Sequence, residues 1–224
     1  MSTATHVRQH NSLLAAAEKR ALIWMATRLP RWVNSDHLSA LGLASMAGAG
    51  IAFVMASSDP VAGASLVVVC LLLNWFGDSL DGTLARVRDQ QRPRYGYYVD
   101  HVIDLAGTAM LFAGLAASGY MSPAIAALVV AAYFLVSAET YLATHARGVF
   151  KMAFLGVGPT ELRILLAAGA VALVNTPSVS PFGVGPLLLW DLGGVIGTIG
   201  MFGAFVVSSA RNTRALYLEE TRRS

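Results

Sequence analysis

The chain has 224 residues, of which 55% are hydrophobic and only 13% are charged, with a formal net charge of +3. Soluble domains carry about 25% charged residues, so this composition indicates a membrane protein and excludes an ordinary soluble domain. The length suits one compact unit over residues 1–224. A single cysteine, Cys70, excludes a disulfide framework and a metal cluster of cysteines and histidines.

The N-terminal arm, residues 1–35, predicts an amphipathic helix lying at the membrane interface. Its apolar residues, among them Leu22 and Trp24, are set against the cationic Lys19 and Arg20. The arm lacks the apolar core of a signal peptide.

Six apolar stretches follow, each near the ~20 residues that a helix needs to cross ~30 Å of hydrocarbon. Turn and breaker residues separate them, as in SSDP at 57–60. We therefore expect an all-α polytopic fold, with a six-helix bundle at 36–210 and a cytoplasmic tail at 211–224. The stretches run over residues 38–57, 62–86, 97–119, 122–145, 159–176 and 186–209.

The basic residues predict the orientation of these spans. All 16 lysines and arginines fall in the N-terminal arm, the 86–94 link, the 147–163 link or the C-terminal tail. The alternate links contain none, so the positive-inside rule places both termini and the 86–94 link in the cytoplasm. The net charge then reflects topology and contact with anionic lipid, not nucleic-acid binding. We expect the protein in a bacterial inner or plasma membrane.

Four aspartates stand at the cytoplasmic ends of two consecutive spans. Asp78 and Asp81 are three residues apart, and Asp100 and Asp104 are four apart, so each pair shares a helix face. A hairpin-length link would bring the two faces together. Because buried carboxylates repel one another, this cluster predicts bound Mg²⁺ or Mn²⁺, and two such ions can clamp a pyrophosphate.

The residues that follow Asp81 suit a nucleotide. Gly82 and Ala85 are small, which leaves room for a nucleotide to approach the backbone. Arg86 lies at the same helix end and can pair with a phosphate.

The run DSLDGTLAR at 78–86 and the three residues Gly96, Asp100 and Asp104 resemble the signature of the CDP-alcohol phosphotransferase family, also called CDP-alcohol phosphatidyltransferases. That signature reads D-x2-D-G-x2-A-R, a short link, then G-x3-D-x3-D, and every fixed residue is present. The link between Arg86 and Gly96 holds nine residues, one more than the commonest spacing. The six-span layout of the family also matches nearly the whole chain.

The resemblance implies a reaction in phospholipid biosynthesis. The hydroxyl of an acceptor alcohol attacks the β-phosphorus of a CDP-alcohol, here expected to be CDP-diacylglycerol, and CMP is released. The resemblance assigns Asp78, Asp81 and Asp100 to two divalent metal ions. It assigns Asp104 to the second ion and to the role of general base. It further implies a homodimer.

The same resemblance suggests residues that hold the substrates. Gly82, Ala85 and Arg86 would contact the CDP moiety. In the segment LPRWVNSDHLSALGL, Asp36 and Ser39 correspond to residues that face the cytidine in the family. A second reading of this segment is a helix cap, in which Ser35 or Asp36 satisfies free backbone N–H groups.

The acceptor side is less defined. Arg163 partly matches the basic residues of members that bind an inositol phosphate, but it is equally consistent with a positive-inside anchor. Glu139 stands where such members carry a cation. Asp191, near the outer end of the last span, is expected to form local hydrogen bonds or to face water.

Two other functions share some of these features. A membrane prenyltransferase also binds pyrophosphate through Mg²⁺ and aspartates, but it uses two separated motifs in about nine spans. An ion-coupled transporter places carboxylates near the bilayer midplane, often in repeated halves. One compact cluster toward one face, in a chain without repeats, favours the phosphotransferase.

Overall fold

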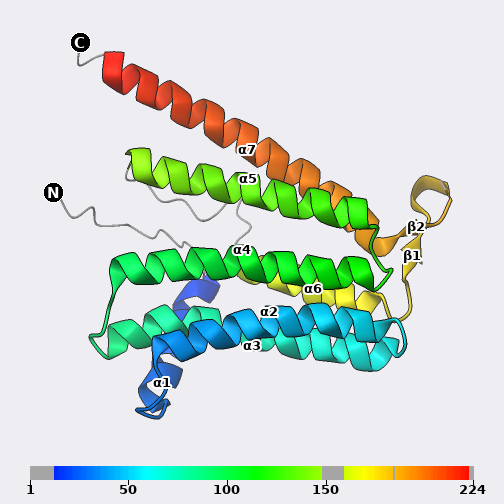
Figure 1. Cartoon of the computed structure of the whole chain (residues 1–224), viewed down its shortest axis with the longest axis horizontal. Coiled ribbons are helices and arrows are strands. Elements are labelled where there is room, and N and C mark those ends of the chain that lie inside the picture. Colours follow the sequence, from blue (N-terminus) through cyan, green and yellow to red (C-terminus); the bar gives the residue numbers. More distant parts are fainter. Residues whose placement is uncertain (1–12, 148–158, 184, 222–224) are drawn as a thin grey trace.

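A computed structural model gives the fold of residues 13–147, 159–183 and 185–221, and all structural statements below concern these residues (Figure 1). The polypeptide is almost entirely helical, which confirms the predicted all-α polytopic fold. The elements are α1 (Leu13–Arg28), α2 (Ser35–Ala56), α3 (Pro60–Val87), α4 (Pro93–Ala117), α5 (Pro123–Arg147), α6 (Pro159–Ala172), β1 (Ser178–Val179), a 3₁₀ turn (Pro181–Gly183), β2 (Leu187–Leu188) and α7 (Leu189–Thr221).

Each predicted span contains a helix, but in the described part of the chain only five of these helices are long and apolar enough to cross a membrane. They are α2, α3, α4, α5 and α7. The sixth, α6, has 14 residues and would extend about 21 Å. It is shorter than predicted because the chain turns after Ala172 and enters a small antiparallel hairpin, in which Val179 pairs with Leu187. At the other end of the chain, α7 continues to Thr221, so part of the predicted tail is helical.

Prolines and polar caps define where the helices begin. The helices α3 to α6 start at Pro60, Pro93, Pro123 and Pro159, where the missing N–H would have no helical partner. The helix α2 is capped by Asn34, whose side chain accepts a hydrogen bond from the backbone N–H of His37. The cap therefore lies one residue before Ser35 and two before Asp36, the two residues that the sequence suggested for it.

The helix α2 lies between α3 and α4, and small residues allow both of these helices to pack closely on it. Gly77 of α3 approaches the backbone of α2 at Leu38 and Gly42 so closely that a Cβ atom would lie 2.5 Å from the Leu38 oxygen. Gly114 of α4 faces Gly50 of α2 in the same way, with a Cβ position 2.2 Å from the Gly50 oxygen. These contacts fix the relative positions of the two aspartate-bearing helices.

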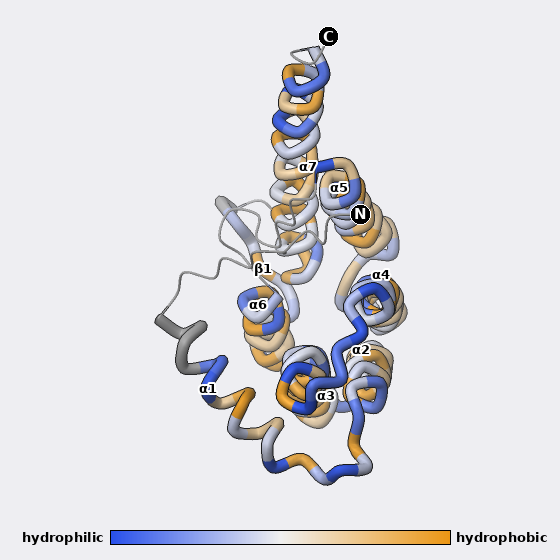
Figure 2. Tube along the Cα trace, turned by 90° about the vertical axis from the view of Figure 1, so that its left-hand side faces the viewer, coloured by the Kyte–Doolittle hydropathy of each residue, from blue (hydrophilic) through white to orange (hydrophobic). Residues whose placement is uncertain are grey.

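The helices α5 and α7 form a second pair, which lies beside α4 and α6 in the end-on view (Figure 2). Ser122, just before α5, donates its N–H and its hydroxyl to the Asp191 carboxylate of α7 over 2.7 and 2.5 Å. This bonding gives Asp191 a structural role, which is to join the start of α5 to α7 between residues 69 positions apart in the sequence. In the core, Trp190 packs edge-on against Phe53 with ring centroids 5.2 Å apart.

The helix α1 packs along α3. Leu22 and Ala26 are buried against Leu80 and Leu84 of α3, whereas Trp24 on the opposite face is 57% exposed. One face of α1 is thus packed on the bundle and the other is left for water or lipid.

Candidate active site

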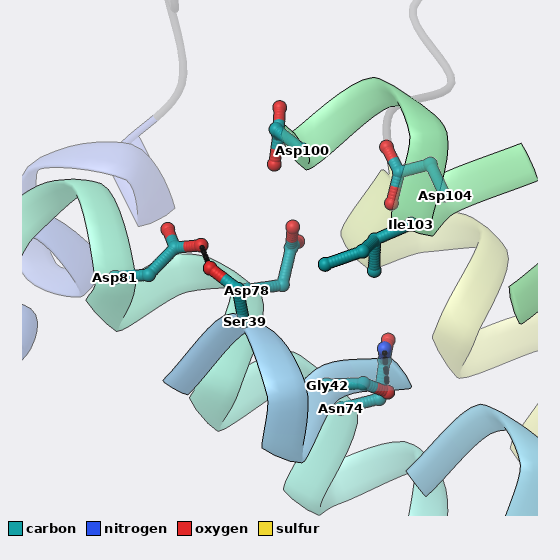
Figure 3. Close-up of a pocket in the computed structure, with 8 residues that line it drawn as sticks. All are labelled: Ser39, Gly42, Asn74, Asp78, Asp81, Asp100, Ile103 and Asp104. Carbon is teal, nitrogen blue, oxygen red and sulfur yellow. Dashed lines mark hydrogen bonds between the residues drawn. The ribbon is translucent and has the colours of Figure 1, made fainter. Parts of the chain in front are cut away.

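One pocket lies between α3 and α4 at the end of the bundle that carries the 88–92 link, and all four signature aspartates line it (Figure 3). The first pair, Asp78 and Asp81, comes from α3, and the second pair, Asp100 and Asp104, comes from α4. The helices α2 and α4 supply the other residues, with one more from α3. The lining consists of Ser39, Gly42, Asn74, Asp78, Asp81, Asp100, Ile103 and Asp104.

Asp81 is held from the α2 side. Its carboxylate accepts a 2.6 Å hydrogen bond from the Ser39 hydroxyl and a 2.5 Å bond from the backbone N–H of Gly82. The Ser35 hydroxyl donates to the Asp81 backbone oxygen over 2.9 Å. The start of α2 is therefore fixed to the signature helix, and the close approach at Gly77 makes these contacts possible.

Asp78 is paired with Arg163 of α6. The guanidinium of Arg163 donates to the Asp78 carboxylate over 2.5 Å and to the side-chain oxygen of Asn74 over 2.7 Å. Asn74 in turn donates to the Gly42 backbone oxygen over 3.0 Å, and it is buried. Of the two readings of Arg163, the structure favours a place in the site over an anchor that faces the lipid headgroups.

Sequence reasoning missed Asn74, and a signal for it was available. It is the only strongly polar residue in the apolar run SLVVVCLLLNWF, and it stands four residues before Asp78 on the same helix face. A polar amide at that position inside a membrane span needs a partner, and Arg163 supplies one.

The α4 side of the pocket carries Asp100 and Asp104. The Asp100 carboxylate lies 3.5 Å from Nδ1 of His101, and its side chain is 35% exposed. Asp104 lies one turn deeper into the bundle and, in Figure 3, points toward the space that Asp78 faces from α3.

Several predicted substrate residues lie at the rim, outside the lining of the pocket. Asp36 forms an exposed 2.5 Å ion pair with Arg92 of the link. Arg86 is exposed and donates to the Thr83 hydroxyl over 3.0 Å. Gly82 and Ala85 are partly exposed on the same end of α3. Of the predicted substrate residues, Ser39 lies in the pocket itself and Arg163 reaches it through Asp78.

Glu139 does not face this pocket. It is buried between α5 and α7, where it accepts hydrogen bonds of 2.8 Å from Ser208 and 2.6 Å from Asn212. Arg147 also points toward α7 and donates to the Asn212 side chain over 2.6 Å. These polar side chains join α5 to α7, so Glu139 and Arg147 are both turned away from the four aspartates of the pocket.

The chemistry of the donor set fits hard divalent cations, because four carboxylates and no sulfur ligand line the pocket. Within the described residues, no three metal-ligating side chains converge as they stand. The reason is visible in the contacts: Asp81 is turned toward Ser39, and Asp78 is turned toward Arg163.

Helices long enough to span a membrane and a pocket lined by four carboxylates at one end of the bundle together indicate an integral-membrane protein with a candidate cation site. The chain belongs to the CDP-alcohol phosphatidyltransferase family, whose sequence model matches residues 36–207. It is a membrane transferase that moves a phosphatidyl group from a CDP-alcohol to an alcohol in phospholipid synthesis. This membership disfavours the prenyltransferase and the transporter.

Two solved structures of the Mycobacterium tuberculosis phosphatidylinositol phosphate synthase (PgsA1) resemble the chain. The match to the form with CDP-DAG bound covers 88% of this chain and 94% of the PgsA1 chain, with a TM-score of 0.60 and 21% sequence identity. The match to the apo form covers 89% of this chain and 94% of the PgsA1 chain, with a TM-score of 0.52 and 19% sequence identity. At this low sequence identity, the similarity to the two PgsA1 structures shows that the chain shares their fold and nothing further. No curated protein sequence matched the chain.

Proposed function

We propose that the protein is a divalent-cation-dependent phosphatidyltransferase that takes CDP-diacylglycerol as its donor. The observation that carries the proposal is the meeting of four carboxylates from α3 and α4 around one pocket, in the signature spacing of the family. A structural relative that binds CDP-DAG supports the choice of donor.

The metal assignment rests on the donor set. Asp78, Asp81 and Asp100 would hold two Mg²⁺ or Mn²⁺ ions, with Asp104 completing the second site. Bound there, the ions would neutralise the pyrophosphate and the departing CMP. Enzymes of the family generally use divalent metal ions, which supports this assignment.

The protein's own groups would then handle the proton and the substrate. Asp104, as general base, would take the proton of the acceptor hydroxyl, whose oxygen forms a bond to the β-phosphorus. The bond between that phosphorus and the bridging oxygen of CMP breaks, so CMP leaves and a phosphodiester forms. A hydroxyl with an ordinary pKa far above 7 needs such a base, and the position of Asp104 beside the other three acids suits this role.

The rim residues would receive the nucleotide. Gly82 and Ala85 leave space beside the backbone, and Arg86 would pair with a phosphate. Asp36 would reach the cytidine after exchanging its pairing with Arg92. Ser39 would orient Asp81 through their 2.6 Å hydrogen bond.

The distribution of basic residues supports an orientation with the active site and both termini in the cytoplasm of a bacterial inner membrane. We further propose a homodimer, as the family resemblance implies. An apolar hollow between α4 and α5, lined by residues such as Phe112 and Phe134, is a surface against which such a partner would pack.

The test uses the purified full-length protein in detergent micelles with CDP-diacylglycerol, Mg²⁺ and a set of acceptor alcohols. The wild type should release CMP only with the divalent cation. Asp104→Asn should lower this release by about 10²–10⁴-fold, the usual contribution of a general base. Asp59→Asn is the matched control, because Asp59 caps α3 at the opposite end and asparagine is an equally good cap. An Asp104→Asn variant with full activity contradicts the base assignment.

A further inference from the structure

The helix α1 lies across the spans instead of along them. In the end-on view the spans are seen down their axes, whereas α1 is seen along its length (Figure 2). It packs on Leu80 and Leu84, in the last two turns of α3. With 28 residues α3 extends about 42 Å, which exceeds the ~30 Å of hydrocarbon in a bilayer. The polar last turns of α3 therefore reach the lipid headgroups, and α1 lies at that level in the plane of the membrane surface.

The side of α1 that faces away from α3, together with the link to α2, carries arginines and indole rings. We call this surface the outer face; it consists of Arg20, Trp24, Arg28, Arg31 and Trp32. The three residues on α1 are spaced four apart, so they share one side of the helix. All five side chains are exposed, the two indoles to 57% and 75%.

The acids nearest to the outer face in the sequence are engaged elsewhere. Glu18 accepts a 3.0 Å hydrogen bond from the indole nitrogen of Trp75 on α3. Asp36 is paired with Arg92 of the link between α3 and α4. The outer face itself contains three positive charges and no acid, so it is complementary to a partner with negative charge.

The link between α1 and α2 is held in place from the end of α3. The guanidinium of Arg88 donates to the backbone oxygens of Leu29 and Pro30 over 3.0 Å each, and to that of Val33. The two outer-face residues of the link stand between these anchored positions. Their exposed side chains are therefore presented from a fixed backbone.

The stacking of Arg28 on Trp24 suits a phosphate group. The guanidinium carbon lies 4.0 Å from the centre of the indole ring, and one guanidinium nitrogen donates to the Trp24 backbone oxygen over 3.4 Å. A guanidinium that stacks through its face keeps its other N–H groups at its edge, where they can bind a phosphate. Indole rings favour the boundary between hydrocarbon and water. A phospholipid satisfies both groups, because its phosphate lies beside that boundary.

We infer that the outer face is a docking surface for anionic phospholipid headgroups of the membrane in which the protein lies. A neutral headgroup would satisfy the indoles but would leave the charges of the three arginines without a counter-charge. Each arginine near an anionic membrane surface strengthens the interaction about fivefold. The surface lies on α1 and the link, apart from the acidic pocket, so the inference does not depend on the proposed function.

The test uses tryptophan fluorescence of the full-length protein in phosphatidylcholine nanodiscs. One lipid in five carries brominated chains, which quench an indole on contact, and this lipid is either phosphatidylglycerol or phosphatidylcholine. The part of the emission that is lost in Trp32→Phe reports on the outer face. In the wild type, quenching of this part should show a preference for phosphatidylglycerol of about tenfold.

The double variant Arg28→Gln, Arg31→Gln should lower this preference about tenfold, because two of the three charges are removed. The matched control is the double variant Arg211→Gln, Arg214→Gln, which removes two exposed arginines from α7 and changes the net charge equally. It should keep the wild-type preference within about twofold. If both double variants keep the wild-type preference, the arginines of the outer face do not bind anionic lipid and the inference is overturned.

A second measurement needs no variant. Salt screens charges at a membrane surface, so the preference of the wild type for phosphatidylglycerol should fall several-fold between low and high salt. A preference that does not change with salt would overturn the inference, as would equal quenching by the two brominated lipids. Quenching by neither lipid would show that the outer face does not touch the bilayer, and a protein partner would then replace the lipid as its occupant.

Discussion

The close contact between α2 and α3 at Gly77 gives a quantitative prediction for stability and activity together. A Cβ atom at this position would lie 2.5 Å from the Leu38 oxygen and 2.9 Å from the Gly42 nitrogen, both in the backbone of α2. Backbone atoms cannot rotate away as the end of a side chain can. Gly77→Ala therefore requires the two helices to separate.

The size of the separation follows from the contact distance. Ordinary contacts begin at 3.4 Å, so relief of the 2.5 Å contact needs a movement of about 0.9 Å. Overpacking of this kind lowers the unfolding free energy by about 1–3 kcal/mol, and the better helix propensity of alanine offsets about 1 kcal/mol of that loss. A shift of about 0.9 Å would also lengthen the Ser39–Asp81 hydrogen bond from 2.6 Å to as much as 3.5 Å, where it is largely lost.

We expect Gly77→Ala to lower the unfolding midpoint in detergent by up to about 8 °C and to lower CMP release about tenfold or more. Thermal unfolding and the CMP assay are measured on the same preparation. Gly200→Ala is the control, since nothing lies within 4 Å of a Cβ at Gly200 in α7. If Gly77→Ala is as stable and as active as Gly200→Ala, the close approach does not position the site.

Three further variants test other contacts. Asn34→Ala removes the cap of α2 and should lower the unfolding free energy by about 1 kcal/mol, measured by denaturation in detergent. Asp191→Ala leaves the N–H and hydroxyl of Ser122 without their acceptor; it should cost about 1–3 kcal/mol in the same measurement and leave the KM values unchanged. Ser39→Ala removes the bond to Asp81 and should raise the Mg²⁺ concentration for half-maximal CMP release several-fold, with little change in stability.

Each of these variants has an outcome that contradicts its contact. The Asn34 cap would be contradicted if Asn34→Ala had the same unfolding free energy as Asn34→Asp, because aspartate keeps a side-chain oxygen that can cap the helix. For Asp191→Ala it is lost activity in a protein that remains fully stable, since that result would place Asp191 in the chemistry. For Ser39→Ala it is an unchanged requirement for Mg²⁺.

Periodicity in the sequence predicts much of the site. The spacing of Asp78 and Asp81, and of Asp100 and Asp104, requires each pair to share a helix face, and the short link requires the two helices to be neighbours. The place of these residues around one pocket could therefore be predicted. The breaker residues likewise predict where most helices begin, because proline at the first position has no N–H to satisfy.

Other features depend on how the helices are rotated and joined, which one sequence does not specify. The sequence places Glu139 on the acceptor side, but the rotation of α5 turns it toward α7. The pairing of Arg163 with Asp78 joins residues 85 positions apart in the sequence. Among the described residues the sixth predicted span contains the 14-residue helix α6, which ends at Ala172 although the hydrophobic stretch continues past that point.

The central claim, that carboxylates of α3 and α4 together bind the divalent ions that CMP release requires, is tested most directly by Mn²⁺ binding. Electron paramagnetic resonance of the protein in lipid nanodiscs counts the bound ions. Wild type should bind two Mn²⁺ per chain over the concentration range that supports CMP release, and a variant with both Asp78→Asn and Asp100→Asn should bind none in that range. Equal binding of Mn²⁺ by the two proteins would contradict the account.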